Sequence, residues 1–136
     1  MLKGLGVFGV WALLGIAMAA HHSIAALYDQ SRPKTIEGVV TEFHFVNPHP
    51  FVVIAVKGGG GSSEPWRLEL DNRIELVQIG FTVDTLKPGD RVVVVGSPAR
   101  RQAQSLYIRR LERPSDGFWY EQVRASPTIG TRSGKG

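Results

Sequence analysis

The chain has 136 residues, a length that suits one domain rather than two. It contains no cysteine, which excludes a disulfide framework, a thiolate metal site and a cysteine nucleophile. The formal net charge of +4 is a modest excess that helps to keep a small protein soluble, and it also favours anionic partners.

The N-terminal residues have the composition of a signal peptide. Lys3 supplies a positive charge, the run from Leu5 to Ile16 is apolar, and Ala17-Met18-Ala19 has the A-x-A pattern of a cleavage site. This run is shorter than the roughly 20 apolar residues of a membrane-spanning helix. We therefore expect residues 1–19 to be removed, by cleavage after Ala19 or Ala20, and the protein to be periplasmic or otherwise exported. Contact with a membrane is expected only if the segment stays uncleaved.

A lead of residues 20–34 follows the cleavage site and carries two adjacent histidines. Cleavage after Ala19 makes Ala20-His21-His22-Ser23 the mature start, and cleavage after Ala20 makes His21 the first residue. In either case a free amine lies within two residues of an imidazole.

The first half of the mature chain predicts three strands. Residues 35–46 (TIEGVVTEFHFV) and 51–57 (FVVIAVK) are rich in β-branched and aromatic side chains, and Gly38 predicts a bulge or a sharp bend. The NPHP segment between them predicts a turn, because its two prolines have no backbone N–H to donate to a neighbouring strand. After a flexible GGGGSS loop, residues 66–70 alternate apolar and polar side chains as a half-buried strand does.

The second half predicts one short helix and two further strands. Asp71 or Asn72 can cap this helix, and Glu75 has the spacing to complete a capping box with Asn72. Gly80 is a typical stop, so we expect a helix that ends at Ile79. Residues 91–96 (RVVVVG) and 105–112 (SLYIRRLE) predict the fourth and fifth strands.

This order of elements predicts a mostly β fold, a small five-stranded OB-like Greek-key barrel with one short helix between strands three and four. Closure removes exposed strand edges in a chain without disulfides, and an open β-sandwich is the alternative. We expect the barrel to occupy residues 35–113. Residues 114–136 predict a tail that is aromatic at Phe118-Trp119-Tyr120 and then disordered.

The histidines are the candidate metal ligands, because imidazole is the commonest protein ligand of transition metals. With Ala20 first, its amine, two backbone amides and His22 can surround Cu(II) or Ni(II) in a square plane. With His21 first, its amine and imidazole chelate together, and His49 can complete a T-shaped copper site. Tetragonal nitrogen coordination suits Cu(II). We therefore predict copper or another divalent metal at His21, His22 and His49, with the N-terminal amine of Ala20 or His21.

Simpler interpretations of the same histidines remain open. Two histidines at a terminus can be solvated polar residues, and His49 can bond the backbone of its own turn. His44 lies between Phe43 and Phe45 in the first strand, and strand alternation points its side chain away from both. That arrangement is typical of a surface residue.

A group of basic and aromatic residues offers a second candidate surface. Its members are Arg100, Arg101, Trp66, Tyr107 and Trp119. On barrels of the OB type, such side chains bind single strands and oligosaccharides. An exported protein rarely meets nucleic acid, so the alternative function is an interaction module for a partner protein or an anionic glycan.

The sequence offers little for catalysis. Glu64, Glu69, Asp71 and Glu75 lie close together, but helix capping and surface solvation explain them. We find no paired-carboxylate spacing, nucleophile elbow or phosphate-binding loop. An enzyme is therefore the class that the residues favour least.

Several short motifs are similar to those of a known family, the small exported bacterial proteins grouped as domain of unknown function 6152. The motifs are His21-His22-Ser23, Tyr28-Asp29, Gly38-x-Val40-Thr41, Asn47-Pro48-His49, Leu86-Lys87-Pro88-Gly89-Asp90 and Gly96-x-Pro98-Ala99. The resemblance runs from about His21 to Glu112. Ile24 stands where the family usually has phenylalanine, and His44-Phe45 departs from its usual acidic and tryptophan residues.

This resemblance has implications for the extent of the domain and not for its activity. It supports export and the bounds of the domain, and it carries no known reaction. It also implies that the two histidine motifs belong together, which favours one site built from His21, His22 and His49.

Overall fold

The computed structural model describes residues 24–123 and 126–133. Residues 24–27 form one helical turn. The named elements are β1 (Lys34–His44), β2 (Phe51–Lys57), the 3-10 turn η1 (Gly59–Gly61), β3 (Ser63–Glu69), α2 (Arg73–Gln78), β4 (Arg91–Pro98), β5 (Ser105–Arg113), β6 (Phe118–Val123) and β7 (Ser126–Thr131). The expected signal peptide lies outside the described residues. Within them, no helix is long and apolar enough to cross a membrane.

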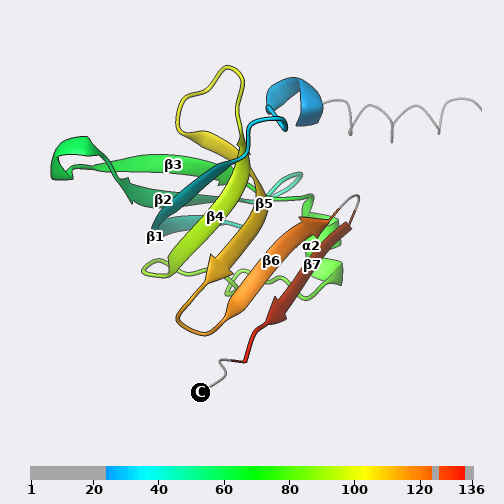
Figure 1. Cartoon of the computed structure of the whole chain (residues 1–136). Helices are drawn as coiled ribbons and strands as arrows, with labels where there is room; N and C mark the ends of the chain where they lie inside the picture. The colour runs from blue at the N-terminus through cyan, green and yellow to red at the C-terminus, as the bar shows by residue number, and fades with distance from the viewer. Residues whose placement is uncertain (1–23, 124–125, 134–136) are drawn as a thin grey trace, which may run out of the picture.

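Strands β1 to β5 close into a barrel (Figure 1). Antiparallel ladders join β1 to β2, β2 to β3, β1 to β4 and β4 to β5. A short parallel ladder then pairs Arg67–Glu69 of β3 with Ser105–Tyr107 of β5 and completes the ring. This closure, with α2 between β3 and β4, confirms the predicted five-stranded barrel and excludes the open sandwich.

The core lies inside this ring because successive side chains of a strand point to opposite faces of the sheet. Val52 and Ile54 of β2, Leu68 of β3 and Leu106 of β5 are all 0% exposed. On β4, Val92 and Val94 are fully buried, whereas Val93 and Val95 are half-buried. The inner face is therefore mainly aliphatic, and none of the charged side chains of these five strands is buried.

The bend in β1 does not come from a bulge at Gly38. The register between β1 and β2 shifts between Val40 and Glu42, so the extra residue is Thr41. Gly38 serves a close approach instead, because a Cβ atom there would lie 2.5 Å from the carbonyl oxygen of Ala55. The sequence located the irregular strand correctly, and the tertiary packing decided which residue bulges.

Helix α2 follows the predicted capping signals. Asn72 is the N-cap, and its Oδ1 accepts a hydrogen bond from the backbone N–H of Glu75 at 2.9 Å. Gly80 then takes a φ of +96° directly after the last turn, which glycine adopts without strain. The helix buries Leu76 completely and so covers one end of the barrel.

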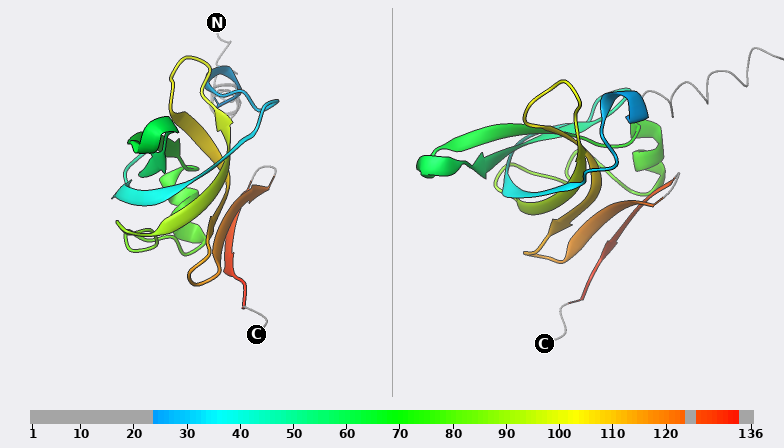
Figure 2. Two further views of the ribbon diagram at one scale, coloured as in Figure 1. Left: turned by 60° about the vertical axis from the view of Figure 1, so that its left-hand side comes forward. Right: turned by 45° about the horizontal axis from the view of Figure 1, so that its top comes forward.

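The structure differs from the expected tail after residue 113. Residues 118–123 and 126–131 form the hairpin β6–β7, which continues the sheet from β5 outside the barrel (Figure 2). The reason is burial of aromatic side chains. Tyr120 is 0% exposed and Phe118 8%, and both rings contact Phe81 with centroids 5.9 and 6.1 Å away.

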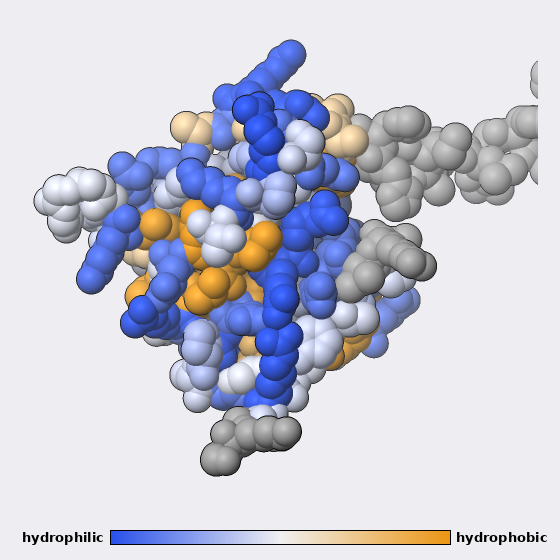
Figure 3. All heavy atoms as spheres, in the orientation of Figure 1, coloured by the Kyte–Doolittle hydropathy of each residue, from blue (hydrophilic) through white to orange (hydrophobic). Residues whose placement is uncertain are grey.

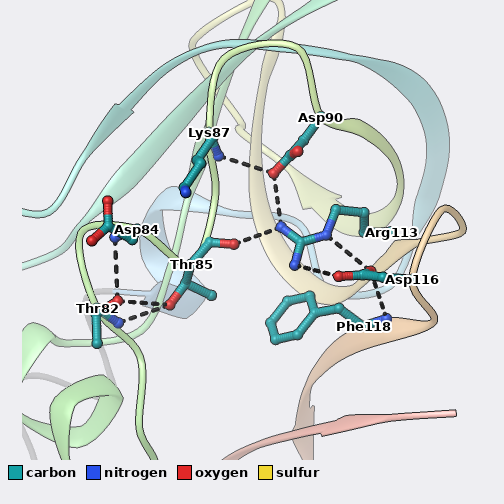
Figure 4. Close-up of polar contacts among 8 residues, drawn as sticks. All are labelled: Thr82, Asp84, Thr85, Lys87, Asp90, Arg113, Asp116 and Phe118. Carbon is teal, nitrogen blue, oxygen red and sulfur yellow. Dashed lines mark hydrogen bonds and ion pairs between the residues drawn. The ribbon is translucent and has the colours of Figure 1, made fainter.

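One arginine fastens the turn before β6 (Figure 4). The guanidinium of Arg113 donates to the Thr85 carbonyl at 2.6 Å, to Asp90 at 2.7 Å and to both carboxylate oxygens of Asp116 at 3.0 and 2.9 Å. It also lies over the ring of Phe118. We call Arg113, Thr85, Asp90 and Asp116 the Arg113 cluster; it joins the β5–β6 turn to the loop before β4.

The outer face of the barrel carries an apolar area among charged side chains (Figure 3). Val39 of β1 is 42% exposed, and Val93 and Val95 of β4 are half-buried on the same face. Two ion pairs border these valines, one between Arg91 and Glu37 and one between Arg110 and Glu112.

Candidate metal centre

His49 is held at one end of the barrel by the backbone on both sides of it. Its Nδ1 lies 3.2 Å from the carbonyl oxygen of Leu70. The Leu70 N–H donates to the Pro50 carbonyl at 2.9 Å, and the Arg73 N–H donates to the Pro48 carbonyl at 3.0 Å. The NPHP turn is therefore joined to the segment between β3 and α2, and the His49 ring has a defined place.

Glu69, the last residue of β3, stands between His49 and the N-terminal lead. Its Oε1 lies 3.8 Å from His49 Nδ1, and its Oε2 accepts a hydrogen bond from the Tyr28 hydroxyl at 2.6 Å. The side chains of His49 and Glu69 are 32% and 20% exposed. Tyr28, Glu69 and His49 thus form a continuous series of polar contacts, which we call the Tyr28–Glu69–His49 series.

Tyr28 brings the N-terminal lead onto the barrel. It forms an isolated bridge with Ala99, in which the Asp29 N–H donates to Pro98 and the Arg100 N–H donates to Leu27. Figures 1 and 2 show this segment beside the loop that joins β4 to β5. The Tyr28 ring packs on Tyr107 with centroids 5.6 Å apart. Burial, and then the hydrogen bond to Glu69, raise the pKa of Tyr28, so its hydroxyl stays protonated and donates.

A second polar group lies beside the first on the same side of the barrel. Gln122 of β6 donates to the Asp71 carboxylate at 2.9 Å and to the Tyr107 hydroxyl at 2.8 Å. Burial raises the pKa of Tyr107 and that of Tyr120. These contacts join β6 to Tyr107, the residue on which the Tyr28 ring packs.

The remaining predicted metal ligands, His21 and His22, lie outside the described residues, as does the amine of Ala20 or His21. In the part of the chain that the structure describes, no group of three or more histidine and carboxylate side chains is arranged to hold a metal ion. His49 is the one predicted ligand that can be placed. Tyr28, six residues after His22, is in contact with Glu69 beside it.

The chain matches a known protein family. The family of unknown function DUF6152 matches the chain over residues 10–107. The chain belongs to the DUF6152 family. Among curated proteins, none matches it.

The DUF6152 match covers the parts of the chain that could build the site. It includes the His21-His22 pair as well as Tyr28, His49 and Glu69, and it ends within β5. The hairpin β6–β7 lies beyond the match. The Tyr28–Glu69–His49 series therefore belongs to the portion that defines this protein as a member of the DUF6152 family.

His44 takes no part in this arrangement. Its Nε2 lies 2.6 Å from a carboxylate oxygen of Glu42, and its ring stacks on Phe51 with centroids 4.4 Å apart. Phe43 and Phe45 pack instead toward Phe81. His44 is a surface residue with its own partners, as strand alternation predicted.

Four of the five residues of the predicted basic and aromatic surface have partners within the chain. Tyr107 is only 3% exposed, because Tyr28 covers it, so it offers no surface to a partner. Lys34 lies over the Trp66 ring, and Trp119 packs against Gly130. Arg100 donates to the carbonyl of Ala25 at 3.2 Å. Arg101 is exposed in the β4–β5 loop, and no hydrogen bond or ring contact found among the described residues joins any two of the five.

Sequence reasoning missed Glu69 and Tyr28 as parts of the site. Glu69 was assigned to surface solvation, and Tyr28 stood out only as part of a family motif. The alternation of WRLEL does place Glu69 on the outward face. No local signal, however, relates it to a tyrosine 41 residues earlier.

Proposed function

We propose that this protein is an exported, periplasmic metal-binding β-barrel that holds copper or another divalent transition metal. Its ligands are His21, His22 and His49, together with the amine of the mature N-terminus. The observation that carries the proposal is the Tyr28–Glu69–His49 series, because it joins the lead that bears two histidines to the third one.

The environment of His49 suits a ligand. A carbonyl oxygen only accepts, so the contact with Leu70 favours the tautomer in which Nδ1 carries the proton. The neutral ring then has its lone pair on Nε2, for which no described residue provides a partner. Histidines that bind metals characteristically donate their other ring N–H to a backbone carbonyl or a carboxylate.

Chain connectivity also permits the histidines to meet. Five residues separate His22 from Tyr28, and a chain of that length reaches at most about 20 Å. The Tyr28 hydroxyl is 2.6 Å from the same carboxylate that lies near His49. We therefore propose that the mature start lies close enough to the NPHP turn for its histidines to share a metal with His49.

The donor set favours copper over the harder cations. Imidazoles and a free amine are nitrogen donors, and Cu(II) prefers tetragonal nitrogen coordination and lies at the top of the affinity order for divalent metals. Calcium and magnesium prefer oxygen ligands. Cleavage after Ala19 gives an amine-X-X-His chelate, and cleavage after Ala20 gives a chelate by His21 alone, completed by His49.

The test uses protein purified from the periplasm with its native N-terminus. Intact mass identifies the first residue, and metal content is measured before and after one equivalent of Cu(II). We expect stoichiometric copper in the wild type and weaker binding in H22A and in H49N. The matched control is H44N, which removes a histidine of the neighbouring strand and is expected to keep the metal.

Two results would contradict the proposal. One is wild-type protein that retains no copper, and the other is equal binding by H49N and the wild type. In either case the alternative function, a barrel that binds a partner protein or an anionic glycan, becomes the working hypothesis. Affinity capture from periplasmic extract, with the R100A/R101A variant as the comparison, then tests that alternative.

A further inference from the structure

We propose that Glu69 is the positioning residue of His49, and that Tyr28 holds Glu69 in this role. Glu69 keeps the proton of the neutral imidazole on Nδ1, so that Nε2 is the atom presented to a metal. The inference rests on the proposed function only in naming a metal as the ligand; the tautomer itself is a property of the chain alone.

The hydrogen bond to Leu70 starts the argument but does not complete it. At 3.2 Å the Nδ1 to oxygen distance is at the long end of the range for an N–H donor. One such bond between neutral groups makes only a small net contribution. A second influence on the same nitrogen is therefore needed to make one tautomer dominant.

Glu69 supplies that influence through its charge. Its Oε1 is 3.8 Å from His49 Nδ1, which is too long for a hydrogen bond. A carboxylate at that distance nevertheless attracts a proton on the nearer nitrogen. Its side chain is 20% exposed, so water screens the attraction only in part. The Leu70 carbonyl and Glu69 therefore act on Nδ1 in the same sense.

Tyr28 determines how the Glu69 carboxylate is oriented. Its hydroxyl donates to Oε2 at 2.6 Å, which fixes one oxygen of the carboxylate and leaves Oε1 turned toward His49. Tyr28 is itself held, because it is 6% exposed and packs on Tyr107. Since Tyr28 also fastens the N-terminal lead to Ala99, the orientation of His49 and the docking of the lead depend on the same contacts.

The first experiment reads the tautomer of His49 in the metal-free mature protein, by long-range 1H–15N correlation. We expect the wild type to be protonated at Nδ1. E69Q removes the charge while keeping an acceptor for Tyr28, and Y28F removes the hydroxyl while keeping the ring on Tyr107. Both should shift His49 toward the Nε2-protonated form. E64Q, which removes an exposed carboxylate from the same strand, should leave the spectrum unchanged.

The second experiment measures the Cu(II) affinity of the same variants. Loss of a group that orients a ligating histidine lowers metal affinity roughly 10- to 100-fold, and we expect E69Q to fall in that range while E64Q matches the wild type. The inference is overturned if wild-type His49 is protonated at Nε2 or if the E69Q variant shows the same tautomer as the wild type. It is also overturned if the E69Q variant binds copper as tightly as the wild type. If the wild type binds no copper, the proposed function is refuted instead. The tautomer data then decide by themselves whether Glu69 controls the protonation of His49.

Discussion

At Asp29, three donors from two neighbouring residues surround one carboxylate. Oδ1 accepts from the Ser31 hydroxyl at 2.6 Å and from the Ser31 N–H at 3.0 Å, and Oδ2 accepts from Arg32 at 3.0 Å. These contacts stabilise the charged form and hold the pKa of Asp29 down to about 2. The carboxylate thereby shapes the turn that leads from Tyr28 into β1. Single residues of this kind set the course of the lead beside the candidate site.

The first residue-scale prediction concerns acid. Because the folded pKa of Asp29 is about 2 and the unfolded value is about 3.9, the group stabilises the fold fully above pH 4. That contribution is lost as the pH falls toward 2. A 13C titration of the side-chain carboxyl should give a midpoint near pH 2 in the wild type and a higher one in S31A. A wild-type midpoint near pH 4 would show that these hydrogen bonds do not persist in solution.

At the scale of elements, the hairpin β6–β7 depends on contacts at its two ends. Phe118 and Tyr120 bury against Phe81, and the Arg113 cluster holds the turn before the hairpin. The Arg113 side chain is 15% exposed and that of Asp90 is 23% exposed, so this ion pair is better shielded than those on the outer strands. The hydrogen bond from Arg113 lowers the pKa of Asp116. The hairpin is therefore a fixed part of the domain.

Replacing Arg113 by lysine should loosen this element. Lysine keeps the charge but cannot reach Thr85, Asp90 and Asp116 together, because only the guanidinium has that planar set of donors. We expect a loss of about 1–3 kcal/mol in the free energy of unfolding, measured in urea, with faster amide exchange in β6 and β7. The control is R132K, whose arginine contacts Glu112 and is 59% exposed; an exposed pair should change stability by less than about 0.5 kcal/mol. Equal effects of the two variants would refute the role given to the Arg113 cluster.

For the whole molecule, the decisive contact is the parallel pairing of β3 with β5. Leu68 and Leu106 lie opposite each other there, and both are 0% exposed. The same ladder pairs Glu69 with Tyr107 and so brings the glutamate to the place where Tyr28 docks. Closure of the barrel and assembly of the candidate site are thus consequences of one pairing.

Truncation of Leu68 tests this dependence. L68A removes a fully buried side chain at the closure and should lower the free energy of unfolding by about 2–5 kcal/mol. The measurement is a urea transition followed by tryptophan fluorescence. V39A, which truncates an exposed side chain of β1, is the control and should cost less than about 1 kcal/mol. An L68A transition that coincides with the wild type would mean that closure does not depend on this pair.

The sequence by itself determined the local elements of this protein. Runs of β-branched and aromatic residues, with alternation in residues 66–70, predicted the five barrel strands. The prolines of the NPHP segment predicted where β1 and β2 separate, and Asn72 with Gly80 predicted the limits of α2. These features depend on a residue and its near neighbours, through the two-residue period of a strand and the unpaired groups at helix ends. His49 could be selected as a candidate ligand for the same reason, because its chemistry is intrinsic.

Only the tertiary structure decided which distant side chains meet. Tyr28 reaches Glu69 across 41 residues, and His49 reaches Leu70 across 21. Neither contact has a local pattern, since each depends on which strands pair and on where the lead docks. The hairpin β6–β7 escaped prediction for the same reason, because Phe118 and Tyr120 are buried only by Phe81, far back in the chain. Burial depends on the assembled barrel, so a local sequence pattern does not reveal it.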